Sequence, residues 1–235
     1  MSAPAAGLRV MLFGATGMVG QGVLRQCLLD AGVERVLCVG RGATGVSNPK
    51  LRDLVLGDLF DYAGVEADLS GFDACFFCLG VSSGGMSEAA YTRITFDLTL
   101  AAAGTLVRLN PAMTFIYVSG AGSDRSERGR TMWARVKGRT ENALLALPFK
   151  AAFMLRPAGI VPMHGERSRT PLYRLFYVWS RPLLPVLRRF APGWMTTTEE
   201  LGRLMIHLAR SGAPQSVLES RDIAPLGARL PANAT

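Results

Sequence analysis

The chain has 235 residues, of which 49% are hydrophobic and 19% are charged, and its formal net charge is +8. This length suits one well-buried domain, and the composition excludes a disordered chain. No apolar run reaches the roughly 18 residues that a membrane span needs, and residues 1–7 show no signal peptide.

Apolar runs alternate with helically spaced segments over the first two thirds of the chain. Strands are predicted at residues 8–13, 35–39, 54–56, 74–79, 113–118 and 151–155, and helices at 18–30, 87–109 and 130–147. Such alternation predicts an α/β fold, a doubly wound and mostly parallel sheet with helices on both faces.

The alternation ends after Arg156 and Pro157. Residues 158–195 are rich in proline, arginine and aromatic residues, and we interpret them as a substrate lid within a small C-terminal cap. A helix is predicted at 198–210 and a short strand within 216–224. We therefore expect a single domain over residues 1–235 and no independent second domain.

Three glycines follow the first predicted strand at a spacing of three. Gly14 permits a tight turn, Gly17 lets the backbone approach a diphosphate, and Gly20 lets helix and strand pack closely. The helix that follows offers free amides and a partial positive charge to an anion. The pattern predicts a dinucleotide site, and the alternative is a glycine-rich turn without a ligand.

The residue after the second predicted strand bears on the choice between NAD and NADP. A carboxylate at this point would bind the ribose 2′-hydroxyl and repel a 2′-phosphate. The chain has Arg41 there instead, and its planar guanidinium pairs well with phosphate. NADP is therefore the predicted cofactor, unless Arg41 is only a solvated loop residue.

With these motifs, the chain resembles the short-chain dehydrogenase/reductase superfamily in its extended or atypical branch. The segments Leu56–Leu59, Cys78–Gly80, Tyr117–Ala121, Arg156–Ile160 and Thr197–Leu201 look like further family motifs. The general look is that of proteins resembling NAD-dependent epimerases and dehydratases, including relatives of Tat-interacting oxidoreductase-like protein.

The resemblance implies a set of cofactor-binding residues. Phosphates would be held by Gly14, Ala15, Thr16, Gly17, Met18, Val19 and Arg41, the adenine by Asp58 and Leu59, and the rest of the cofactor by Cys78, Leu79, Gly80, Ser119, Lys137, Pro157, Ala158 and Ile160.

The family's chemistry uses a serine and a Tyr-x-x-x-Lys pair, in which the lysine lowers the tyrosine pKa so that the phenol can exchange a proton. Ser119 and Lys137 are present, but Trp133 occupies the tyrosine position. An indole N–H cannot shuttle a proton. Tyr91 and Tyr117 are other potential donors, although Tyr117 lies on a predicted core strand.

Several interpretations of Trp133 remain open. The protein could bind NADP as a sensor without turnover, or use another acid such as Ser119, Tyr91 or a water molecule. Trp133 could also stack on a planar substrate or the nicotinamide, or simply pack under the cap. Lys137 could be a surface residue, and Ser119 could satisfy local backbone amides.

Other residue types add little chemistry. Four cysteines lie in apolar stretches, which suits free thiols in a reducing compartment and predicts a cytoplasmic protein. We expect no metal site, and a loop role for His164 is favoured over acid–base chemistry.

Basic residues concentrate in one part of the chain, with 16 basic and 5 acidic residues over 125–210. The arginine-rich and aromatic stretch Leu172–Phe190 favours a lid or a homodimer surface over a membrane surface, and no nucleic-acid motif supports specific binding to nucleic acid.

These features predict an NADP-binding oxidoreductase or epimerase-like enzyme that acts on a small molecule. The alternative is a non-catalytic NADP-binding sensor or regulator that engages a protein or membrane partner through its basic C-terminal segment.

Overall fold

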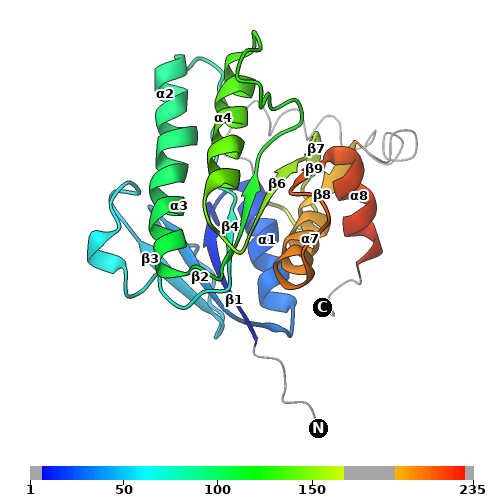
Figure 1. The fold of residues 1–235 in the computed structure, drawn as a ribbon. Helices are drawn as coiled ribbons and strands as arrows, with labels where there is room; N and C mark the ends of the chain where they lie inside the picture. The colour runs from blue at the N-terminus through cyan, green and yellow to red at the C-terminus, as the bar shows by residue number, and fades with distance from the viewer. Residues whose placement is uncertain (1–6, 167–193, 231–235) are drawn as a thin grey trace.

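The computed structural model describes residues 7–166 and 194–230. Its centre is a seven-stranded sheet in the order β3-β2-β1-β4-β5-β6-β9, with every neighbouring pair parallel. The strands are β1 (Leu8–Phe13), β2 (Val33–Gly40), β3 (Leu51–Val55), β4 (Ala74–Phe77), β5 (Thr114–Val118), β6 (Ala151–Arg156) and β9 (Val217–Glu219) (Figure 1). The chain moves outward from β1 in both directions, so the doubly wound α/β prediction is confirmed.

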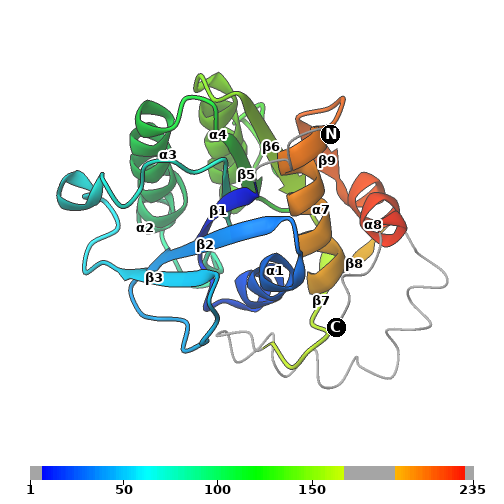
Figure 2. The same ribbon diagram turned by 90° about the horizontal axis from the view of Figure 1, so that it is seen from below.

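The helices cover both faces of this sheet. They are α1 (Met18–Leu29), α2 (Glu88–Thr92), α3 (Leu98–Leu109), α4 (Met132–Ala146), α7 (Thr198–Ser211) and α8 (Ser220–Arg229), with a π-helical turn η2 (Arg93–Asp97) joining α2 to α3 and a 3₁₀ turn η1 (Ala63–Val65). Figure 2 shows α1 on the opposite side of the strands from α2, α3 and α4. The predicted single helix over 87–109 therefore exists, with a π turn inside it.

Alternating residues of the central strands fill two apolar layers. On β1, Val10 and Leu12 point to the layer shared with α1 and α7, whereas Met11 and Phe13 point to the layer shared with α3 and α4. This is what a period of two requires of a strand that is buried on both faces. The ring of Phe13 stacks on that of Phe77 at 5.1 Å between centroids.

Helices α1 and α7 pack closely because each presents a glycine to the other. A Cβ added at Gly22 would lie 2.4 Å from Cβ of Thr198, and one at Gly202 would lie 2.8 Å from Cγ of Gln26. The C-terminal part of the chain is thereby fixed against the first αβ unit.

Three elements differ from the sequence-based prediction. Strand β3 begins at Leu51 instead of residue 54, because it pairs with β2 from Val36↔Leu51 onward. The strand expected within 216–224 ends at Glu219, where Glu219 and Asp222 form a capping box that starts α8. Helix α8 was not predicted from the sequence, because it contains Pro225 and proline is rare in helix interiors.

A second, two-stranded parallel sheet was not expected. Strand β7 (Gly159–Val161) pairs with β8 (Met195–Thr197), so the two ends of the predicted lid region lie side by side. Residues 167–193 lie outside the described part of the chain, and the lid at 158–195 stays a prediction. Among the helices that are described, none combines the length and apolarity that crossing a membrane requires.

Candidate functional site

The turn between β1 and α1 has the geometry that its glycines predict. Gly14 adopts a φ of 78°, in the left-handed region, and a Cβ there would lie 2.7 Å from the carbonyl carbon of Cys78. A Cβ at Gly20 would lie 2.1 Å from the carbonyl oxygen of Gly14. Both positions therefore exclude a side chain. The amide of Gly17 donates to the same Gly14 oxygen at 3.0 Å, which closes the turn.

The start of α1 is open to an anion. Its N-cap, Gly17, has no side chain to accept from the first amides, and the first turn holds no acidic residue. The amides of Met18 and Val19 therefore lack a side-chain acceptor, and the helix dipole favours a negative charge in front of them. The Thr16 carbonyl accepts from Nε2 of Gln21 at 3.0 Å, which holds the turn against the helix.

The carboxyl ends of the parallel strands bring further predicted residues to the same edge. Cys78, directly after β4, donates its amide to Phe13 at 3.0 Å, and Leu79 and Gly80 follow it outward. The Pro157 carbonyl, after β6, accepts from Ala121 at 3.1 Å. The chain thus turns away from the sheet at each of these strand ends, which is where doubly wound folds bind ligands.

The predicted cofactor residues after β6 and near the adenine position make contacts within the protein itself. Ala158 donates its amide to Oγ of Ser220 at 3.2 Å, and Ile160 is part of β7. Asp58 is exposed, but its carboxylate accepts from the amide of Phe60 at 2.9 Å. The side chain of Leu59 is buried in the core. Any adenine contact of Leu59 would therefore involve its main chain.

Arg41 is exposed directly after β2, where the ribose of a dinucleotide is expected. Among the described residues it has neither a carboxylate partner nor a hydrogen-bond acceptor.

At the end of β5, Ser119 is only 8% exposed and its hydroxyl is engaged by other side chains. Its Oγ donates to Oε1 of Glu141 at 2.5 Å and lies 2.9 Å from Oγ of Ser123. The alternative in which Ser119 serves local backbone amides is therefore not what the structure shows.

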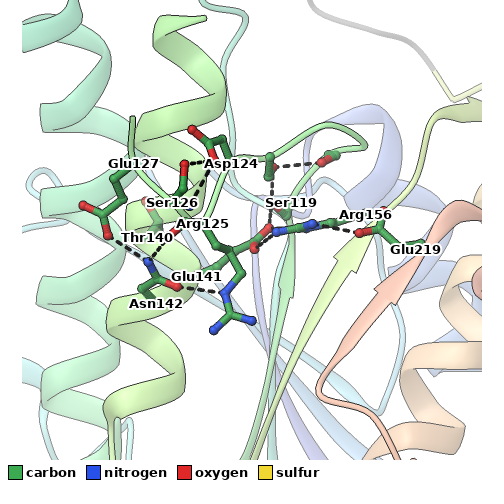
Figure 3. A network of polar contacts seen from close by, with 12 residues as sticks. Ser119, Asp124, Arg125, Ser126, Glu127, Thr140, Glu141, Asn142, Arg156 and Glu219 are labelled. Carbon is green, nitrogen blue, oxygen red and sulfur yellow. Dashed lines mark hydrogen bonds and ion pairs between the residues drawn. The ribbon is translucent and has the colours of Figure 1, made fainter. Parts of the chain in front are cut away.

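Glu141 and Arg156 form a buried ion pair beneath Ser119 (Figure 3). The carboxylate of Glu141 is fully buried and receives Nε and Nη2 of Arg156 at 2.9 and 2.5 Å, while Nη1 of Arg156 reaches Glu219 at 2.8 Å. These contacts raise the pKa of Arg156, first of all through the hydrogen bond to Glu141. The network joins α4, β5, β6 and β9.

Sequence reasoning did not assign a role to Glu141. A signal existed, since Glu141 follows Lys137 by four residues and so lies on the same face of the helix. Arg156 closes an otherwise apolar strand, which was a second signal that a buried charge needs a partner.

Lys137 lies in the same region, with Nζ 5.4 Å from the centroid of the Tyr117 ring. Burial lowers the pKa of Lys137 to about 8, and the charge of Glu141 opposes that shift. Tyr117 and Tyr91 are both buried, and burial raises the pKa of each. Both phenols therefore keep their protons near neutral pH.

Trp133 lies on the first turn of α4, one turn before Lys137, and is partly buried. A methyl group at Gly122 would lie 3.6 Å from Cη2 of Trp133, so the indole rests against the β5–α4 loop. This loop is held by Asp124, whose carboxylate accepts from Ser126 and Gly129.

The cysteines and His164 were the remaining candidates. The cysteines are free thiols, and the described residues bring no three His, Cys, Asp or Glu side chains together as metal ligands. Nε2 of His164 lies 3.7 Å from a carboxylate oxygen of Glu199.

Comparisons with known proteins agree with this geometry. No family model matches the chain. It is 25% identical over 217 residues to the mitochondrial protein FMP52-2 of Scheffersomyces stipitis, covering 88% of this chain and 90% of that protein. It is 26% identical over 205 residues to mitochondrial fmp52 of Emericella nidulans, covering 84% and 85%. The names of these relatives contradict the expected cytoplasmic location, which is therefore corrected.

Solved structures share the fold at lower sequence identity. The Bordetella bronchiseptica enzyme WbmF in complex with NAD⁺ matches with a TM-score of 0.65 at 17% identity, covering 98% of this chain and 82% of that one. The UDP-N-acetylglucosamine 4-epimerase of Methanobrevibacter ruminantium matches with a TM-score of 0.68 at 15% identity, covering 91% and 76%. A short chain dehydrogenase family protein from Francisella tularensis matches at 0.64 and 14%, covering 91% and 96%. The chain therefore has the fold of the extended short-chain dehydrogenases and NAD-dependent epimerases.

Proposed function

We propose that the protein binds a nicotinamide dinucleotide, with NADP preferred, and acts on a small molecule as an oxidoreductase or epimerase-like enzyme. The observation that carries this proposal is the β1–α1 turn, where Gly14 and Gly20 exclude side chains and α1 begins without a cap or an acid. Solved structures of the same fold are described as complexes with NAD⁺ or NAD, which supports the same class of cofactor.

The residues at the sheet edge would hold the cofactor from the phosphates to the nicotinamide. Main-chain amides of residues 14–19 would bind the diphosphate, and Arg41 would meet the adenosine ribose and its phosphate. The segments 78–80 and 157–160 would flank the nicotinamide half, beside Ser119 and Lys137. When bound, the nicotinamide supplies hydride exchange with a carbon of the substrate.

With Trp133 in place of a tyrosine, proton handling falls to Lys137 and Ser119. Lys137 has a pKa lowered to about 8, so it can gain and lose a proton near neutral pH. Ser119 can take a proton from a substrate hydroxyl as its own proton moves toward Glu141, 2.5 Å away. Trp133 would supply a flat apolar wall and no proton.

A second function is favoured by the same contacts. The hydroxyl of Ser119 is already committed to Glu141, and Arg156 holds that carboxylate in place. A serine fixed in this way and a tryptophan at the tyrosine position suit an NADP-binding sensor or regulator without turnover. A protein or membrane partner would then engage the basic C-terminal segment.

Turnover separates the two functions. NADPH absorbance is followed with a panel of aldehydes and ketones, for the wild type, Lys137→Ala and the exposed control Lys150→Ala. Consumption of NADPH that is lost only in Lys137→Ala supports the enzyme. Tight NADPH binding by calorimetry without consumption across the panel supports the regulator. Absence of binding to both NADPH and NADH overturns the proposal.

A further inference from the structure

A cavity of about 680 Å³ lies beside the phosphate turn, between α1, the β2–β3 loop and the loop after β7. It begins at Ala15 and Thr16, runs along the outer face of α1, and is bounded by Ala43 and Thr44 of the β2–β3 loop. The cavity therefore touches both segments that surround the adenosine ribose in a dinucleotide site of this fold.

Arg25 is the arginine that lines this cavity, and its guanidinium has no protein partner among the described residues. Its Nε atom is buried without a hydrogen-bond acceptor. Two other arginines of the chain are paired by contrast: Arg52 lies 2.7 Å from Asp68, and Arg210 lies 2.7 Å from Asp30. A buried guanidinium nitrogen without an acceptor is unusual, and an anionic ligand is one physical reason for it.

The position of Arg25 on α1 directs it toward the phosphate turn. Arg25 follows Gln21 by four residues on the same face, and Gln21 donates to the Thr16 carbonyl at 3.0 Å. Long side chains on a helix lean toward its N-terminus, so the guanidinium leans toward Thr16. Asp53 on β3 accepts from the amide and the hydroxyl of the lining residue Thr44, both at 3.0 Å, which ties the β2–β3 loop to β3.

The carboxylate of Glu166, which lines the cavity, accepts hydrogen bonds from other protein groups. Glu166 accepts from Oγ1 of Thr198 at 3.1 Å and from the amide of His164 at 2.7 Å, so both of its oxygens face protein donors. His164 in turn lies 3.7 Å from Glu199. Among the described residues that line the cavity, Arg25 is the permanently charged cation, and it has no carboxylate partner there.

We propose that Arg25 binds the 2′-phosphate of NADP and, with Arg41 two residues before the lining residue Ala43, makes the site prefer NADP over NAD. This inference rests on the proposed function, since it assumes a dinucleotide with its diphosphate on α1. A diphosphate at the start of α1 and a ribose beyond the end of β2 place the 2′-oxygen between Thr16 and residues 41–44. That space is the mouth of the cavity that Arg25 lines.

Calorimetry with NADP⁺ and NAD⁺ tests this role on the wild type, Arg25→Gln and Arg25→Lys. We expect Arg25→Gln to weaken NADP⁺ roughly ten- to a hundredfold and to leave NAD⁺ within about twofold, because one charge-assisted phosphate contact is lost. Arg25→Lys keeps the charge without the fork and should fall between. Adenosine 2′,5′-bisphosphate and 5′-AMP should reproduce the same difference without the nicotinamide.

Arg52→Gln is the matched control, because Arg52 lines a smaller cavity elsewhere but is neutralised by Asp68. It should leave both affinities unchanged. An Arg25→Gln protein with unchanged NADP⁺ affinity, or with equal losses for the two dinucleotides, overturns the role of Arg25 and leaves the proposed function standing. A wild type that binds neither dinucleotide removes both.

Discussion

The proposed dinucleotide site has a phosphate end at the β1–α1 turn and a reaction end around Ser119. The two ends match the motifs of the family that the chain resembles to different degrees. At the phosphate end, Gly14, Gly17 and Gly20 all take the positions that a diphosphate site requires. At the reaction end, Ser119 and Lys137 are present, but Trp133 replaces the tyrosine and a buried Glu141 holds the serine. The glycine pattern is therefore complete at one end, while the residues around Ser119 differ from the family pattern at the other.

The difference follows from what each end uses. Phosphate recognition relies on main-chain amides, and these can approach a ligand only where side chains are absent, so glycine has no substitute. Proton transfer relies on side chains, and one set of hydrogen-bonding groups can replace another without disturbing the fold. The first end is therefore strictly constrained, and the second is open to change.

The largest effect on dinucleotide binding is expected from Gly20→Val. Its Cβ would lie 2.1 Å from the Gly14 carbonyl oxygen, so the turn and the helix must separate, at a cost of about 1–3 kcal/mol or more and with loss of dinucleotide binding. Calorimetry and thermal unfolding measure both. Gly104→Ala on α3 is the control, because its Cβ would meet no heavy atom within 4 Å. If Gly20→Val binds NADP⁺ like the wild type, the phosphate end is misassigned.

The largest loss of stability is expected from Glu141→Ala, at the reaction end. Arg156 would be left as a buried charge without its main partner, which costs about 3–5 kcal/mol of unfolding free energy. Urea unfolding provides the measurement. Glu66→Ala, in the exposed Arg108–Glu66 pair, should cost far less, because solvent screens the charges of that pair. Equal costs for the two variants would contradict a structural role for the buried pair.

Lys137, at the reaction end, should make the free energy of unfolding depend on pH. Its pKa is lowered in the folded protein from 10.5 to about 8, so between these values the unfolded chain holds a proton that the folded protein has released. Raising the pH through this window therefore favours folding. The unfolding free energy of the wild type minus that of Lys137→Met should increase from pH 8 to pH 10. The exposed Lys150→Met should show no such trend, and a flat difference for Lys137→Met would contradict the shifted pKa.

The smallest effect is expected from Arg41→Asp at the phosphate end. Arg41 is exposed, so solvent screens its charge, and we expect the ratio of NADP⁺ to NAD⁺ affinity to fall by about fivefold. Calorimetry with both dinucleotides measures this ratio. An unchanged ratio would remove Arg41 from the site and leave Arg25 as the sole candidate for the 2′-phosphate.

Most of the sheet could be predicted because its signals are local. Strands β1, β2, β4, β5 and β6 each contain an apolar run of four or five residues, and such runs suit strands that are buried on both faces. Strand β3 and helix α8 were harder to place. The start of β3 depends on its pairing with β2, and α8 begins at a capping box and continues through Pro225, against the local preference.

The sequence by itself determined the turn at Gly14–Gly20, since glycines at this spacing permit a positive φ and a close approach of helix and strand that a side chain would exclude. Only the tertiary structure decided what surrounds Ser119. Its partner Glu141 lies 22 positions further along the chain, and Arg156, which bonds to Glu141, lies 37 positions further, so nothing in the local sequence states that they meet. Arg25 likewise reads as an ordinary helix residue until folding places it in a cavity with Thr16 and Thr44. The conformation of a turn depends on residues that are neighbours in the sequence, whereas side-chain contacts depend on which distant segments the fold brings together.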